Sequence, residues 1–136
     1  MGIRISTAGL SQFISEIPEG CIISVEGSID PVKGVFVYDV VKSAISAGRR
    51  TVYVTSHSSE DVMGALSTSI SDESKLSVIE FNESDDLRTV LPNNGLLVLD
   101  SFSFQMLDKT AVELREVLAW LRSAAKKTNT PVLLTV

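Results

Sequence analysis

The chain is poor in the residues that carry sulfur and imidazole chemistry. Among its 136 residues it has one cysteine, Cys21, and one histidine, His57. A lone cysteine excludes an internal disulfide, and its place in an apolar segment indicates a small core residue. His57 has no second histidine or cysteine near it, so neither a metal cluster nor a catalytic triad can be assembled locally. We interpret His57 as a solvated loop residue; the alternative is a residue that lines a ligand crevice.

Positive charge is also scarce. The chain has 12 Lys and Arg against 17 Asp and Glu, a formal net charge of -5. Because binding to phosphate backbones needs clustered Lys and Arg, this balance argues against nucleic acid as a partner. The basic pairs Arg49-Arg50 and Lys126-Lys127 each fall where a helix is expected to end, so we interpret them as complements of the helix dipole.

Long hydrophobic runs are absent as well. No apolar segment has the length of a membrane span, and Met1–Ser15 lacks the apolar stretch of a signal peptide. We therefore expect a cytoplasmic protein with no membrane contact. The composition is 44% hydrophobic and 21% charged, and no linker or repeat divides the chain. Residues 1–136 are expected to form a single domain with a substantial core.

What is present is an alternation of short apolar strands with amphipathic helices. Strands rich in apolar and β-branched residues are predicted near 22–26, 51–55, 76–81, 96–100 and 131–136. Helices are predicted over Gly9–Ile17, over Pro31–Ala47 with Gly48 as its end, after a capping box at Ser58–Asp61, and after Thr110-x-x-Glu113. Parallel strands need crossover connections, so the sequence predicts a three-layer αβα fold of the α/β class with a mainly parallel sheet.

The segment Gly20–Ala47 has the pattern of a phosphate-binding loop: a buried strand, a turn and an amphipathic helix. Gly27 and Lys33 stand at the spacing of G-x-x-x-x-G-K-[ST], in which backbone N–H groups and the lysine hold a triphosphate. The match is broken at three places, one of which is Asp30-Pro31, where an open loop is needed. Val32 replaces the glycine before the lysine, and Gly34 replaces the hydroxyl residue that would hold magnesium.

Asp30 and Pro31 favour a different use of this loop. An aspartate at a helix N-cap accepts from the free N–H groups, and proline at the first helical position loses nothing because its missing donor is not needed there. Asp30 would thus supply the helix with its own anion where a phosphate would otherwise sit. A phosphate about 4 Å away would be repelled by roughly 4 kcal/mol at an effective dielectric near 20. We expect Lys33 to pair with Asp30 or to point into solvent; the alternative is a retained nucleotide contact.

Five segments, taken in order, resemble the archaeal-type RecA/KaiC-like branch of the P-loop ATPases. They are Ser6–Leu10 with Ile17–Gly20 (the opening segment), Gly27–Lys33 (Walker A), Val52–Thr55 (the strand that leads to a catalytic acid), Leu97–Ser101 (Walker B with its following serine) and Val132–Thr135 (the sensor strand). The resemblance implies a RecA-like core truncated after its fifth strand, with the strand order third, second, fourth, fifth, first. It also implies nucleotide contacts by Gly27, Asp30, Lys33 and Gly34, a Walker B-like pair at Asp100 and Ser101, and a metal bound through water at Asp100.

The departures from this family pattern fall where phosphate chemistry would occur. In the family a glutamate pair follows the second strand, and its first member activates the attacking water; here Ser56-His57-Ser58 stand in those places. Asp100 is also explained as a turn or capping residue after a strand. Our first hypothesis is a pseudo-ATPase without a cofactor that acts as a regulatory or scaffold binding module. The alternative is an ATP- or ADP-binding protein, or a weak ATPase, that uses Mg²⁺ at Asp100.

Association is expected at the strand before the degenerate loop. Proteins of the resembling family continue past the strand at Pro131–Val136 with further strands, one of which pairs with the outer side of the strand at Cys21–Val25. The resemblance therefore implies an apolar sheet edge with no proline or lysine to protect it. We expect Ile3–Ser6 to fold over this edge, or another chain to cover it as a homodimer or a heteromeric protein partner.

Overall fold

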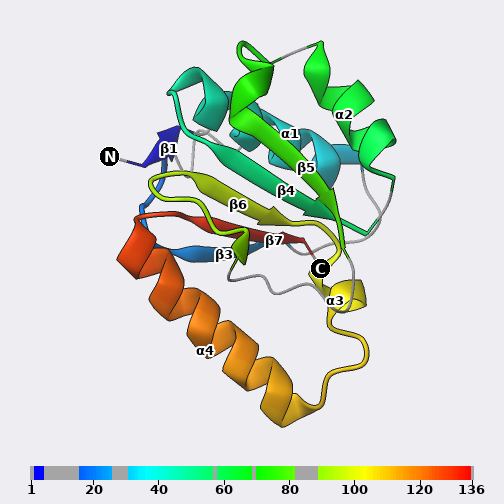
Figure 1. Cartoon of the computed structure of the whole chain (residues 1–136), viewed down its shortest axis with the longest axis vertical. Coiled ribbons are helices and arrows are strands. Elements are labelled where there is room, and N and C mark those ends of the chain that lie inside the picture. The colour runs from blue at the N-terminus through cyan, green and yellow to red at the C-terminus, as the bar shows by residue number, and fades with distance from the viewer. Residues whose placement is uncertain are drawn as a thin grey trace.

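The computed structural model describes residues 2–4, 16–25, 31–56, 58–68, 70–81 and 89–135. Within these residues the centre is a five-stranded parallel sheet of β3 (Ile22–Val25), β4 (Thr51–Thr55), β5 (Leu76–Glu80), β6 (Leu96–Leu99) and β7 (Val132–Thr135) (Figure 1). The strands lie in the order β3-β7-β6-β4-β5, and every neighbouring pair is parallel. The predicted strands and the strand order implied by the resemblance are confirmed.

Helices cover both faces of the sheet. The helices α1 (Pro31–Ser46) and α2 (Ser59–Ser67) pack on one face, and α3 (Phe102–Gln105) and α4 (Ala111–Thr128) pack on the other (Figure 1). A short 3-10 helix, η1 (Glu73–Lys75), precedes β5. This is the predicted αβα layering. None of the described helices is long and apolar enough to cross a membrane.

The strands are apolar on both faces because both faces are covered. Successive strand residues point to opposite sides, so Val98 and Leu133 pack toward α1 while Leu99 and Leu134 pack toward α4. The predicted stripe of α1 is buried, with no member more than 2% exposed: Val37, Val40, Val41, Ala44 and Ile45. Burying one such side chain contributes roughly 1.5–3 kcal/mol. Packing on two faces therefore explains why β4, β6 and β7 are buried along their whole length.

The ends of α1 and α4 follow the predicted signals. Gly48 has a φ of +80° and donates its N–H to Ile45 O at 2.9 Å, which ends α1. Thr110 caps α4: its hydroxyl accepts the Glu113 N–H at 3.1 Å, and the Glu113 carboxylate accepts the Thr110 N–H at 3.2 Å. The hydrogen bond from the Thr110 N–H lowers the pKa of the Glu113 carboxyl, because it favours the charged form.

The predicted capping box of α2 is wrong. Ser58 occupies the N-cap position, but among the described contacts its side chain makes no capping bond. The Ser59 N–H donates instead to a carboxylate oxygen of Glu80, at the end of β5, at 2.8 Å. A residue distant in the sequence thus supplies the hydrogen-bond acceptor that the local pattern assigned to Ser58.

We expect Thr110→Ala to lower the free energy of unfolding by about 1 kcal/mol, because it removes the hydroxyl that caps α4. Ser58→Ala is the matched control, since Ser58 also precedes a helix but makes no capping bond among the described contacts. It should change the stability by less than about 0.5 kcal/mol. Urea denaturation followed by circular dichroism measures both. Equal losses in the two variants would contradict the assignment of the caps.

The N-terminal segment differs from the prediction. In the described part of the chain, β1 (Ile3–Arg4) and β2 (Glu16–Ile17) form a separate antiparallel pair with Ile3 opposite Ile17. The predicted helix Gly9–Ile17 is therefore wrong at its end, and its first part lies outside the described residues. Ile3 and Ile17 are each 1% exposed, so burial of this cross-strand pair overrides the helical spacing. Ile3–Arg4 thus pairs with β2 and not with β3, which contradicts the first of the two expected covers for the edge of β3, the fold-back of Ile3–Ser6.

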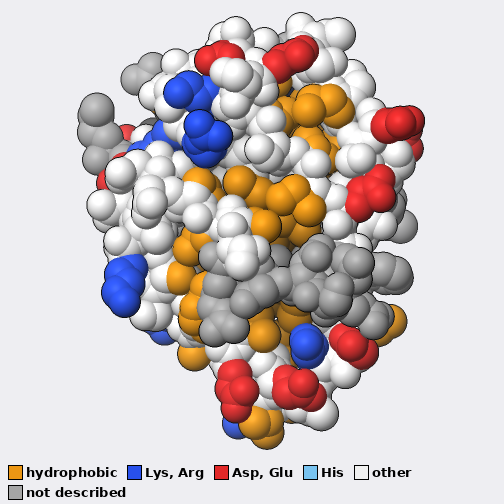
Figure 2. Space-filling model, in the orientation of Figure 1, with side chains coloured by type: hydrophobic (Ala, Val, Ile, Leu, Met, Phe, Trp, Pro, Cys, Tyr) orange, Lys and Arg blue, Asp and Glu red, His pale blue; other side chains and the backbone are white. Residues whose placement is uncertain are grey.

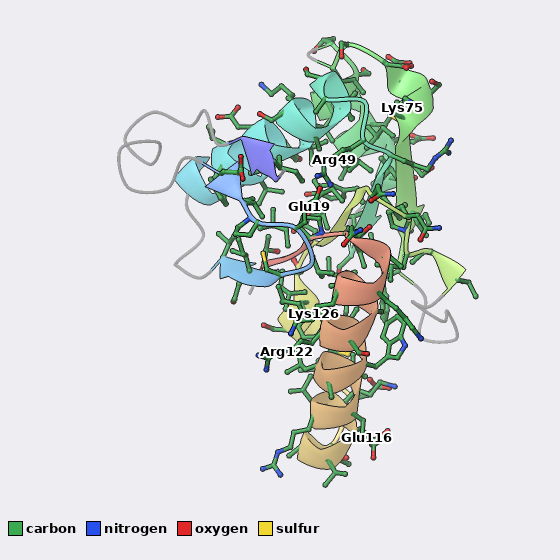
Figure 3. All side chains as sticks on the ribbon, turned by 90° about the vertical axis from the view of Figure 1, so that its left-hand side faces the viewer. Glu19, Arg49, Lys75, Glu116, Arg122 and Lys126 are labelled. Carbon is green, nitrogen blue, oxygen red and sulfur yellow. The ribbon has the colours of Figure 1, made fainter. Side chains whose placement is uncertain are left out.

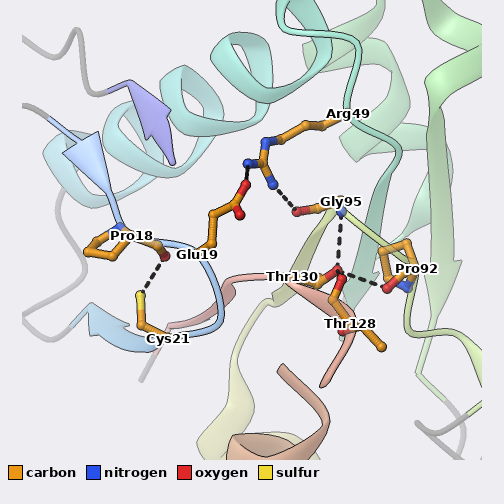
Figure 4. Close-up of polar contacts among 8 residues, drawn as sticks. All are labelled: Pro18, Glu19, Cys21, Arg49, Pro92, Gly95, Thr128 and Thr130. Atoms are coloured by element: carbon orange, nitrogen blue, oxygen red, sulfur yellow. Dashed lines mark hydrogen bonds and ion pairs between the residues drawn. The ribbon is translucent and has the colours of Figure 1, made fainter. Parts of the chain in front are cut away.

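Side-chain bonds tie the loops at the amino end of the sheet (Figure 4). Arg49 forms an ion pair with Glu19 and donates to Gly95 O at 3.2 Å. The hydroxyl of Thr130 is buried; it donates to Pro92 O at 2.8 Å and accepts the Gly95 N–H at 3.1 Å. These bonds join the segments that precede β3, β4, β6 and β7. The strands are therefore tied together at the end opposite to their carboxyl ends.

The two basic pairs have different outcomes. Lys126 and Lys127 lie in the last turn of α4, as predicted. Arg49 lies beyond the end of α1 and pairs with Glu19, so the prediction that it complements the dipole of that helix is wrong.

Cys21 is half-buried beside the core, and its thiol donates to Pro18 O at 3.0 Å. Burial raises the pKa of this thiol, which keeps it protonated.

Candidate functional site

The candidate site lies at the carboxyl ends of β4, β6 and β7. Asp100 directly follows β6, and both oxygens of its carboxylate accept a hydrogen bond from a hydroxyl of a neighbouring strand. The phenol of Tyr53, in β4, donates to Oδ2 at 2.9 Å, and the hydroxyl of Thr135, in β7, donates to Oδ1 at 3.0 Å. Tyr53 is 2% exposed and Thr135 is 4% exposed. Asp100 thus joins three strands through their side chains.

Further bonds hold the backbone around Asp100. Ser101 has a φ of 63°, in the left-handed region, and its N–H donates to Thr135 Oγ1 at 2.6 Å. The buried amide of Gln105 donates to Asp100 O at 2.8 Å and to Val54 O at 3.2 Å. Ser56 Oγ donates to Asp100 O at 3.2 Å. The turn after β6 is therefore fixed by bonds from both neighbouring strands and from α3.

The electrostatics of Tyr53 favour its role as a donor. Burial, followed by the charge of Asp100, raises the pKa of the Tyr53 phenol far above its ordinary value. Tyr38, on α1, lies beside it with a distance of 6.2 Å between ring centroids and a tilt of 53°. Burial also raises the pKa of Tyr38, again with a contribution from Asp100. The raised pKa favours the protonated form of the Tyr53 phenol, which is the form that donates to Asp100.

The sequence-predicted site residues are only partly brought together by the described structure. Asp100 and Ser101 lie at the carboxyl end of the sheet, as the Walker B resemblance implied. Gly27, Asp30 and His57 lie outside the described residues. Lys33 and Gly34 belong to the first turns of α1, which begins at Pro31 as predicted, and their side chains are likewise outside the described part. The phosphate-loop residues therefore remain predictions.

Sequence reasoning missed the two hydroxyl residues that engage Asp100. Tyr53 and Thr135 were identified only as members of strands, and Asp100 was interpreted as a turn or capping residue. Its carboxylate instead bonds to side chains of the two adjacent strands. The signal that pointed to them was weak: a tyrosine within the β-branched strand TVYVT, and a threonine near the end of a strand of leucines.

Among the described residues of this site, Asp100 is the carboxylate available to magnesium. Mg²⁺ favours one or two carboxylates and keeps several of its own waters. Each Asp100 oxygen already accepts one hydrogen bond, from Tyr53 or from Thr135, which leaves one acceptor site on each oxygen, and glycine at position 34 has no hydroxyl to offer. Across the described ranges, no group of three or more His, Cys, Asp or Glu residues could hold a metal ion.

One face of the sheet is incompletely covered. Ile79, Phe81 and Trp120 pack against the core on the α4 side but are only half-buried. Figure 2 shows hydrophobic side chains that reach the surface between charged ones. Ile79 and Phe81 lie at or just beyond the end of β5, which pairs with β4, one of the strands that hold Asp100.

No family model matches the sequence, and neither does any curated protein. Solved structures do resemble it. A KaiC-like protein from the hyperthermophilic archaeon Pyrococcus horikoshii superposes with a TM-score of 0.74 at 19% identity, over 100% of this chain and 70% of that one. The flagellar accessory protein FlaH from Methanocaldococcus jannaschii gives 0.73 at 18% identity, over 99% and 70%. At such identities the likeness concerns the fold, and by fold this chain is a RecA-like αβα domain of the kind found in KaiC-like proteins and FlaH.

Proposed function

We propose that this domain is a pseudo-ATPase: a RecA-like domain that acts as a regulatory or scaffold binding module and does not hydrolyse ATP. The observation that carries the proposal is the set of hydrogen bonds around Asp100. The resemblance assigns this carboxylate to a magnesium ion bound through water. Here it accepts from Tyr53 and Thr135, which are both buried. Its charge is used to hold β4, β6 and β7 together.

The cost of returning Asp100 to a metal supports this view. A hydrogen bond to a charged group contributes roughly 1.5–3 kcal/mol, so each hydroxyl that is displaced by a metal-bound water costs a comparable amount. Tyr53 is 2% exposed, so water cannot replace Asp100 as the acceptor for its phenol. Binding of Mg²⁺ in a way that displaces either hydroxyl from Asp100 would therefore have to offset the loss of a bond inside the fold.

The position of the missing base supports the same conclusion. In the family pattern, a glutamate after the second strand activates water. Ser56 stands after β4 here, and its hydroxyl donates to Asp100 O at 3.2 Å. A serine hydroxyl that is used as a donor offers no carboxylate to take a proton from water. Hydrolysis thus lacks a base in the described part of the site.

Calorimetric titration with ATP and Mg²⁺ tests the proposal. We expect no saturable heat with the wild-type chain up to about 1 mM nucleotide, a concentration that corresponds to a binding free energy of about 4 kcal/mol. Lys33→Ala should give the same result. The matched control is Lys42→Ala, which removes a lysine of the same helix whose ammonium pairs with Asp39 at 3.4 Å.

The second candidate function, an ATP- or ADP-binding protein or weak ATPase, is supported by one feature. Lys33 falls in the first turns of the helix that follows β3, as in a phosphate-binding loop. Micromolar affinity that Lys33→Ala abolishes and Lys42→Ala leaves intact would establish this alternative. ATP hydrolysis that disappears with Asp100→Ala would do the same.

A further inference from the structure

The strand β3 is the end of the described sheet. Its inner side pairs with β7, from Ile22 opposite Val132 to Val25 opposite Thr135, and no described strand pairs with its outer side. The Val132 N–H donates to Cys21 O at 2.9 Å. Because backbone groups alternate along a strand, those of Ile22 and Ser24 are directed to the outer side. An edge of this kind is a template for an added strand.

The two faces beside this edge differ in character. On the α1 side, Ile23 and Val25 are half-buried and pack against the core. Apolar side chains of an added strand would extend this core. On the α4 side, Ile22 is half-buried and Ser24 is exposed, so polar side chains would be tolerated there. The edge thus favours a strand with alternating apolar and polar residues.

The α4 helix adds positive charge beside the edge. Arg115, Arg122 and Lys126 are separated by seven and four residues, so they share one side of the helix. All three are exposed, and none forms an ion pair with another described residue. Figure 3 shows Arg122 and Lys126 on the side of α4 that faces β3, with Glu116 on the other side. We call these three residues the basic stripe.

The position of the basic stripe is fixed by close packing at Gly20. A Cβ at this glycine would lie 3.0 Å from the Lys126 Cα, so the backbone of α4 lies against the segment that enters β3. Gly20 also has a φ of 67°, which a larger residue would adopt only with strain. The polar side of an added strand would therefore run past Lys126 and Arg122.

We propose that the outer edge of β3 binds an extended acidic segment of a partner protein. The segment adds as a strand, turns alternate carboxylates toward the basic stripe and turns β-branched side chains toward Ile23 and Val25. The proposal names the partner class of the binding module proposed above, but it does not depend on the loss of nucleotide binding. It gives a basic surface a role in a chain whose net charge is -5.

A second copy of this chain fits the edge less well. Twofold pairing of two antiparallel β3 strands places both α4 helices on the same face of the joined sheet. The basic stripes of the two copies would then face each other across the junction. Like charges brought together disfavour association, whereas carboxylates beside the same stripe favour it. Charge complementarity therefore selects an acidic strand over self-association.

The test uses the intact chain and two fluorescein-labelled peptides, acetyl-(Val-Glu)₄ and acetyl-(Val-Lys)₄, in fluorescence anisotropy titrations. We expect saturable binding of the glutamate peptide only. Arg122→Glu with Lys126→Glu should weaken it by about tenfold, since reversal turns two attractions into repulsions. The matched control is Lys127→Glu, the same change of sign on a different side of α4, which should change the affinity by less than about twofold. N-methylation of alternate peptide amides should abolish binding, because strand pairing needs those N–H groups.

Three results would overturn the proposal. The first is that the glutamate peptide does not bind at about 1 mM. The second is that the double charge reversal leaves its affinity unchanged. The third is a stable dimer in sedimentation equilibrium in which the Ile22 and Ser24 amide protons are protected from exchange without peptide. The last result would assign the edge to a second copy. The nucleotide titration tests a separate claim. ATP binding would refute the pseudo-ATPase proposal and leave the peptide result unaffected. Failure of the peptide to bind would refute the edge proposal and leave the pseudo-ATPase proposal unaffected.

Discussion

Asp100→Ala is expected to lower the free energy of unfolding by about 2–4 kcal/mol, because hydrogen bonds to a charged group contribute roughly 1.5–3 kcal/mol each. The substitution leaves the Tyr53 phenol and the Thr135 hydroxyl without their acceptor, and both residues are buried. Urea denaturation followed by circular dichroism measures the loss. If the carboxylate instead served to bind a metal ion, Asp100→Ala would raise the free energy of unfolding, because functional groups commonly reduce stability.

The control for this prediction is Asp108→Ala. Asp108 is exposed in the turn after α3, so the same chemical change should cost less than about 0.5 kcal/mol there. A double-mutant cycle with Tyr53→Phe isolates the bond to the phenol, and we expect a coupling of at least about 1 kcal/mol. If Asp100→Ala were as stable as the wild type, or more stable, the structural role of Asp100 would be refuted.

Leu121→Ala is expected to cost about 3–5 kcal/mol, the range for a leucine that leaves a cavity in a packed core. Leu121 is 0% exposed, and it and Ala125 are the buried residues of α4. Leu121 is thus the largest fully buried side chain by which α4 is attached to the sheet. The single tryptophan, Trp120, lies on the same helix and reports its detachment by fluorescence.

Leu118→Ala is the matched control for Leu121→Ala, because Leu118 is on the same helix but only half-buried. We expect it to cost about half as much, in proportion to the apolar area removed from water. If the Trp120 signal changes at a lower urea concentration than the circular dichroism, α4 separates before the sheet unfolds. Equal costs for the two leucines would contradict the packing described for α4.

The sheet could be predicted from the sequence because its strands are buried on both faces. Leu96–Leu99 and Thr51–Thr55 are nearly continuous apolar or β-branched runs, and a buried parallel strand needs no other signal. The strand β2 could not be predicted in this way. The apolar spacing around Ile17 is that of a helix. Ile17 forms a strand because it pairs with Ile3, which is distant from it in the sequence.

The candidate site was predicted in part, for a related reason. Asp100 was identified because it ends an apolar strand. Its partners were not, because the Tyr53 phenol reaches it only when β4 and β6 are adjacent and in register, with Tyr53 opposite Val98. Thr135 depends in the same way on β7 lying beside β6. Local patterns do not contain the register between strands, so they could not show that Asp100 is engaged.

The place of β7 in the sheet also decides when the domain can fold during synthesis. Ile22 pairs with Val132, 110 residues later in the chain. At roughly 5–20 residues per second, the ribosome needs about 5–20 s to complete the partner of β3 after β3 itself has been made. For that time the inner edge of β3 lacks its final neighbour. Nascent chains should therefore depend on a chaperone until β7 has left the exit tunnel.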